Sequence, residues 1–208
     1  MFSVVCAAGG AAPLTGLRAH RTFDFNQATH AAFLLVVAPV VGAPRGCCLA
    51  MTMEWLHNWR AHPMTAYVTW VGLTGGGHPG VLAHTVAVYA PPGPWSTTTT
   101  TVMGGLGFAA HGGLTAGPAG AGIAAALSVL VLGAQSTILI ARGALGAHAV
   151  GVRRVRDSVF FFDPNHGELF FESAVEFGVW FFASFAPACL VPILGAGAVL
   201  TYHTLRYN

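Results

Sequence analysis

Residues 61–141 contain no Asp, Glu, Lys or Arg, and this gap restricts the fold more than any other feature of the sequence. A globular surface in water normally carries charge every few residues, whereas a charged side chain in hydrocarbon is costly to bury. Only 8% of the chain is charged, compared with about 25% in a typical water-soluble domain. The sequence therefore predicts that lipid surrounds much of this chain.

We expect an all-α integral membrane protein with about three transmembrane helices (range two to four), extended neutral loops and an interfacial amphipathic helix. A charged connector at 142–176 precedes the last span. Three parts are expected. Residues 1–50 form an N-terminal arm with a possible targeting segment and an apolar helix that either spans the membrane or lies at its surface, 51–101 form an interfacial helix and an extended loop, and 102–208 form a membrane bundle.

Aromatic and apolar patterns locate the individual helices of this prediction. Trp55 and Trp59 lie four residues apart and suit an interfacial helix whose indoles contact lipid headgroups. The bundle helices are expected at 102–117, 119–141 and 177–201.

Small residues recur every four positions in the first two of these helices and predict a ridge that packs closely against a neighbouring helix. Compositional drift towards Gly and Ala is the alternative explanation. The ridge consists of Gly105, Ala109, Gly113, Gly117, Ala121 and Ala125.

The connector at 142–176 concentrates the charges that the preceding region lacks. By the positive-inside rule, its arginines predict a cytoplasmic location for this loop, or a matrix or stromal location if the protein belongs to an organelle. Asp163-Pro164-Asn165-His166-Gly167 predicts a turn. Glu168, Glu172 and Glu176 recur every four residues and predict one face of a helix.

Four cysteines are present, and their positions show no paired CxxC spacing of a metal or iron–sulfur site. Buried, reduced thiols are the expected state, with lipidation of the neighbours Cys47 and Cys48 as an alternative. The ten histidines offer the other candidate chemistry. His111 and His148 are the pair that would ligate haem b, and the alternative is that both are ordinary satisfied histidines.

Two short motifs consist of Arg60, His62, Pro63, Thr65, Tyr67 and Trp70, and of Gly151, Val152, Arg153, Arg154 and Asp157. Together they resemble the layout of the cytochrome b anchor subunit of succinate dehydrogenase, although His62 and Pro63 stand in swapped order. The resemblance implies a membrane anchor that holds haem and binds a quinone, with His111, His148 and Arg153 involved.

The favoured function is a non-catalytic accessory subunit of a respiratory-chain complex in the mitochondrial inner membrane. The alternatives are the haem- and quinone-binding anchor or an accessory subunit of a thylakoid photosystem. Other membrane subunits and the bilayer are the expected partners. Bound lipid is expected, haem b is a possible cofactor, and no catalytic or metal-binding residue is predicted. The small net charge of +2 does not indicate binding to nucleic acid.

Overall fold

The computed structural model describes residues 20–23, 48–61, 79–89, 95–110, 115–118, 136–195 and 201–208. Its elements in chain order are β1 (His20–Phe23), α2 (Cys48–Ala61), α4 (Pro79–Tyr89), α5 (Trp95–Gly105), β2 (Thr115–Pro118), β3 (Ser136–Gly143), β4 (Gly146–Val155), β5 (Ser158–Asp163), β6 (Gly167–Phe171), α7 (Ala174–Trp180), η1 (Phe181–Leu190), α8 (Val191–Leu194) and β7 (Thr201–Tyr207).

One sheet unites the described strands in the order β1-β6-β5-β4-β3-β7-β2. Every neighbouring pair in this order is antiparallel. Strands β3 to β6 follow one another in sequence and in space, and short turns connect them. The predicted turn at 163–167 is confirmed, because it joins β5 to β6 and the His166 amide donates to the Asp163 carbonyl at 3.0 Å. Gly167 adopts a φ of 86° there, a conformation that glycine tolerates best.

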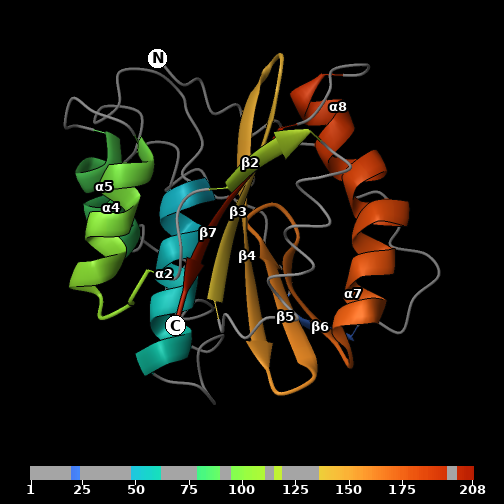
Figure 1. Cartoon of the computed structure of the whole chain (residues 1–208), viewed down its shortest axis with the longest axis horizontal. Coiled ribbons are helices and arrows are strands. Elements are labelled where there is room, and N and C mark those ends of the chain that lie inside the picture. Colours follow the sequence, from blue (N-terminus) through green and yellow to red (C-terminus); the bar gives the residue numbers. More distant parts are fainter. Residues whose placement is uncertain are drawn as a thin grey trace.

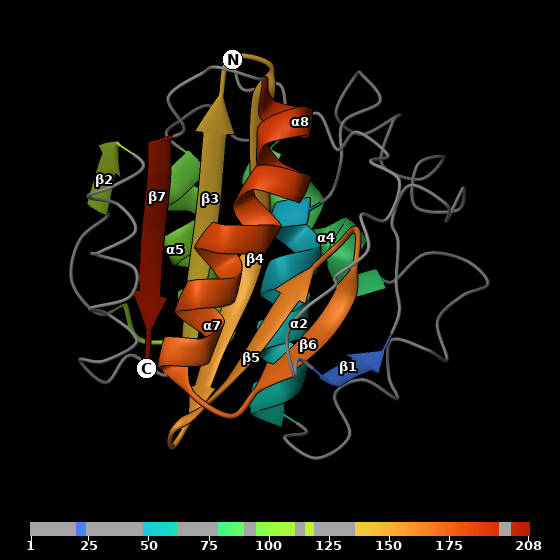
Figure 2. The same cartoon turned by 90° about the vertical axis from the view of Figure 1, so that its right-hand side faces the viewer.

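Helices cover both faces of the sheet and give the molecule three layers (Figure 1). Helices α2, α4 and α5 lie on one face. The continuous helical segment α7–η1–α8 crosses the other face, in front of β3, β4 and β5 in the view of Figure 2.

Side chains of the central strands alternate between two cores. In β3, Ile138 and Ile140 belong to the core beneath α2, whereas Leu139 and Ala141 belong to the core beneath α7 and η1. Successive side chains of a strand point to opposite faces, so a strand covered on both sides is apolar throughout. This explains why β3, at the end of the neutral run, resembles part of a membrane helix in sequence.

The prediction of an all-α membrane protein is wrong, because the described residues form a mixed α/β fold around an antiparallel sheet. Ala174–Leu194 is the single helix within the described ranges that is long and apolar enough to cross a membrane. The helix packs on the sheet through Phe177, Trp180 and Phe181, which are almost fully buried. A helix in the core of a protein has the same apolar composition as a spanning helix, which accounts for the error.

The predicted helix boundaries are also wrong. The helix expected at 102–117 ends at Gly105, and Thr115–Pro118 is a strand. The helix expected at 119–141 is replaced from Ser136 onward by β3, while 119–135 lie outside the described residues. The final helix ends at Leu194, and β7 begins at Thr201.

Candidate active site

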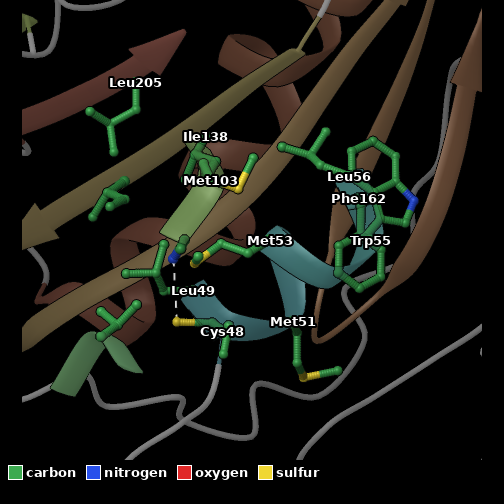
Figure 3. Close-up of a cluster of buried hydrophobic side chains, with 14 of the residues drawn as sticks. Cys48, Leu49, Met51, Met53, Trp55, Leu56, Met103, Ile138, Phe162 and Leu205 are labelled. Atoms are coloured by element: carbon green, nitrogen blue, oxygen red, sulfur yellow. Dashed lines mark hydrogen bonds between the residues drawn. The ribbon is translucent and has the colours of Figure 1, made fainter. Parts of the chain in front are cut away.

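Cys48 is the first residue of α2, and its side chain is buried against the sheet. The Ala149 amide of β4 donates to Cys48 Sγ at 3.4 Å. Figure 3 shows Cys48 beside Leu49 at the start of this helix, within the core that also contains Met53. The N-terminus of a helix carries partial positive charge, which stabilises a thiolate.

Direct packing on β4 fixes the position of α2. A Cβ atom at Gly151 would lie 2.6 Å from the Trp55 ring, so only glycine permits this approach. Trp55 Nε1 and Trp59 Nε1 donate to the same Glu168 oxygen, at 2.6 and 2.8 Å. The predicted helix at this position is confirmed, but its indoles bind a buried carboxylate on β6 and do not form a headgroup anchor. Glu168 lies on a strand, β6. The prediction that Glu168, Glu172 and Glu176 share one face of a helix is therefore wrong.

His148 and Asp163 form a buried pair beside Cys48. His148 lies on β4 and Asp163 ends β5, and both are at most 1% exposed. His148 Nε2 lies 2.8 Å from Asp163 Oδ1. The His148 side chain also hydrogen-bonds to Cys48. Because Nε2 faces Asp163, Nδ1 is the ring nitrogen left for the thiol.

The electrostatics of the pair favour charged forms of both side chains. Burial by itself lowers the pKa of His148, but the charge of Asp163 and the hydrogen bonds to Asp163 and Cys48 raise this pKa to about 10. Burial acts in the opposite direction on Asp163, yet His148 and His166 hold the pKa of its carboxyl well below the ordinary range. An imidazolium next to a carboxylate is the form that can in turn stabilise a thiolate.

A second histidine binds the other oxygen of the same carboxylate. His166 Nδ1 lies 2.6 Å from Asp163 Oδ2, and the Asn165 amide donates to Oδ1 at 2.9 Å. His166 Nε2 lies 3.8 Å from Sγ of Cys189, a buried residue of η1. Burial lowers the pKa of His166, but Asp163 and Cys189 together raise it to about 10. Asp163 is therefore shared by two Cys–His pairs.

The structure describes only some of the residues proposed from the sequence. His148 lies in the candidate site but faces a carboxylate and a thiol, and His111 lies outside the described residues. Arg153 lies over the Trp59 ring at 5.5 Å. Of the proposed helix ridge, Gly105 ends α5, Ala109 follows that helix and Gly117 lies in β2. Gly113, Ala121 and Ala125 lie outside the described residues.

Sequence reasoning missed Cys48 as a chemical group and proposed His148 only as a possible haem ligand or an ordinary histidine. The available signal was a cysteine three residues before the helix expected from Met51, followed far downstream by a histidine and by the Asp-Pro-Asn turn. Residues far apart in a sequence can meet in a fold, so this order carries no geometry by itself. These residues also lack the short, regular spacing of a metal site, so no local pattern marks them.

The fold and the site together define a class of protein. Cys48, His148 and Asp163 form a thiol–imidazole–carboxylate set on a mixed α/β scaffold, with the thiol at a helix N-terminus. This is the residue set of enzymes that use a cysteine nucleophile.

Comparison with known proteins agrees with this class. Residues 129–189 match the peptidase C58 family, described as Yersinia/Haemophilus virulence surface antigen. The matched segment contains His148 and Asp163 but not Cys48, so the thiol is placed in the site by the structure alone. No curated protein matches the chain significantly.

Two solved structures resemble the chain. The Pseudomonas avirulence protein AvrPphB has a TM-score of 0.58 at 16% identity, with 78% of this chain and 92% of that chain covered. The chain shares the fold of this protein. The YopT domain of the Pasteurella multocida PfhB2 toxin gives a TM-score of 0.27 at 15% identity, with 86% and 91% covered. That score is too low to indicate a shared fold.

These findings overturn the functional predictions made from the sequence. A non-catalytic respiratory subunit, its membrane partners and a mitochondrial or thylakoid location all depended on the membrane bundle, which the α/β fold replaces. The match to a peptidase family contradicts the expectation that the chain is not an enzyme. The physical origin of these errors is the apolar composition of a helix and a central strand that are buried within the protein.

Proposed function

We propose that this chain is a cysteine peptidase in which Cys48 is the nucleophile, His148 the general base and acid, and Asp163 the group that orients His148. The observation that carries the proposal is the hydrogen-bonded series from Cys48 through His148 to Asp163, with 2.8 Å between His148 Nε2 and Asp163 Oδ1. The peptidase family match over His148 and Asp163 supports it.

Each group has a defined task in the proposed reaction. The Cys48 thiolate attacks the carbonyl carbon of a peptide bond, a C–S bond forms, and the carbonyl electrons move onto oxygen. N–H groups in the first turn of α2 point out of the helix end and suit stabilisation of this oxyanion. The C–N bond then breaks, and the His148 imidazolium gives its proton to the leaving amine.

Water completes the proposed cycle. His148 takes a proton from a water molecule, which attacks the thioester carbonyl and releases the acid product and the Cys48 thiolate. Asp163 accepts from Nε2 throughout and keeps the other ring nitrogen directed at the thiol. The substrate class is a polypeptide. Because the descriptions of the matching family and of AvrPphB refer to virulence, we propose to test proteins of another organism first.

Active-site labelling tests the proposal without knowledge of the natural substrate. The full chain is incubated with a peptidyl epoxide that alkylates activated thiols, and the modified residue is located by mass spectrometry. We expect an adduct on Cys48 that is lost in His148→Ala. Fluorescently labelled casein serves as a general substrate, and we expect Cys48→Ala to abolish any cleavage by the wild-type chain.

Cys189 provides the matched control for this experiment, since it is a second buried thiol next to a histidine. Cys189→Ala should keep both the labelling of Cys48 and the cleavage. Preferential alkylation of Cys189, undiminished labelling of Cys48 in His148→Ala, or casein cleavage by Cys48→Ala would contradict the proposed roles.

A further inference from the structure

Three potential metal ligands converge between α2 and α4, on a part of α2 separate from Cys48. Glu54 and His57 lie three residues apart on α2 and therefore share one face of the helix, and His84 lies in the middle of α4. Glu54 Oε2 lies 2.8 Å from His84 Nε2 and 3.7 Å from His57 Nδ1. The three ligand atoms all lie within 4.8 Å of one another.

The surroundings of this cluster favour a bound cation. Glu54 and His84 are buried, at 5% and 7% exposure. His57 Nδ1 is shielded from solvent and has no hydrogen-bond partner in the described structure, although its ring is partly exposed. A buried polar nitrogen without a partner is costly, and a metal ion at the carboxylate would satisfy it.

The first turn of α4 leaves room for the carboxylate. A Cβ atom at Gly80 would lie 2.5 Å from Glu54 Oε2, so any other residue would force the carboxylate to move. Asn58 Nδ2 donates to the second oxygen, Oε1, at 3.3 Å and orients the group. An amide that holds the other oxygen of a carboxylate in this way is a common outer partner of a metal ligand.

Two imidazole nitrogens and one carboxylate oxygen form a ligand set that zinc accepts. Tetrahedral zinc with bonds of about 2.0–2.1 Å requires ligand atoms about 3.3 Å apart. The separations of 2.8 and 3.7 Å bracket this value. Rotation of the partly exposed His57 ring is the main adjustment needed, and the same exposed side offers a route for an incoming ion.

We propose that Glu54, His57 and His84 bind one zinc ion that links α2 to α4. Water completes the coordination. The ion stabilises the helix that presents Cys48 and takes no part in peptide hydrolysis, so this site is independent of the peptidase proposal.

Zinc binding is tested on the full chain carrying Cys48→Ala, which removes the nucleophilic thiol as a competing ligand. The protein is stripped with a chelator, and zinc is titrated by calorimetry. We expect one zinc per chain. His57→Ala should weaken binding by at least about 100-fold, because even loss of an outer partner of a metal ligand costs 10–100-fold. His203→Ala, which removes a partly buried histidine on β7, should leave the affinity unchanged.

A second measurement separates loss of ligands from loss of fold. Glu54→Gln keeps the shape of the side chain, and its circular dichroism without metal should match that of the parent while its zinc affinity falls. Cobalt should give a tetrahedral absorption spectrum that is lost in His57→Ala. Absence of stoichiometric binding to the parent at micromolar zinc, or unchanged affinity in folded His57→Ala, would overturn the proposal.

Discussion

The two Cys–His pairs that share Asp163 contain the same residue types but occupy different positions in the fold. Cys48 begins the α-helix α2 on one face of the sheet, whereas Cys189 lies one residue before the end of the π-helical segment η1 on the other. The positive end of a helix dipole stabilises a thiolate at Cys48, and this assistance is missing at Cys189. A neighbouring histidine and carboxylate are therefore not enough to make a cysteine thiol a nucleophile, because the N-terminus of the helix also contributes.

The largest predicted effect comes from the carboxylate that both pairs share. Asp163→Asn keeps the side-chain shape but removes the charge next to His148 and His166. We expect kcat to fall by about 10⁴ and the free energy of unfolding to fall by about 3–5 kcal/mol. Casein cleavage and urea unfolding measure the two effects.

Asp157→Asn is the control for this substitution, because that carboxylate lies in the turn between β4 and β5 and its side chain is 94% exposed. It should change neither quantity. If Asp163→Asn affected stability but not kcat, the comparison would fail and Asp163 would have a purely structural role.

A change of pH is expected to have an intermediate effect on the stability of the fold. This effect distinguishes His148 from His166. Folding raises the pKa of both imidazoles from 6.5 to about 10, so their contribution to stability is complete below pH 6.5 and is lost as the pH rises towards 10. The carboxyl of Asp163 acts in the opposite direction, and its contribution is lost as the pH falls below 3.8. His166→Phe removes one imidazole, so the alkaline loss of stability should shrink by roughly half.

Urea unfolding of wild type and His166→Phe at pH 6 and pH 9 measures this difference. Casein cleavage should persist in His166→Phe, because His148 keeps both Asp163 and Cys48. An identical pH dependence in the two proteins would show that His166 does not share the charge of the carboxylate.

The smallest effect is predicted for the thiol of the second pair. Cys189→Ala leaves a small cavity among apolar neighbours such as Phe185 and should lower the free energy of unfolding by about 1 kcal/mol. The rate of casein cleavage should stay unchanged. A large loss of activity would mean that Cys189 and Cys48 act as one unit, which would remove the distinction between the two pairs.

Turns and helices that depend on neighbouring residues could be predicted from the sequence, whereas packing between distant segments could not. The turn at 163–167 depends on neighbouring residues, and α2 follows from a helical spacing of aromatic residues, so both appear in the structure. Residues 138–141 are apolar on both faces of the sheet because helices cover both sides, and such a run has no alternation to mark it as a strand.

The candidate site was hidden for a related reason. Cys48 contacts the Ala149 amide across 101 residues, and no local pattern reports that approach. The sequence offers His148 only as a possible haem ligand with His111, whereas its chemistry depends on partners that only the fold reveals.

The consecutive hairpins β3 to β6 have a consequence for the order of refolding. They close over short turns, so the strands that carry His148 and Asp163 can pair early. Cys48 must arrive from a distant part of the chain, and loop closure over that distance is entropically slower. Sheet formation observed by circular dichroism should therefore precede the recovery of a reactive thiol, and a chain trapped between these stages would possess the base without its nucleophile.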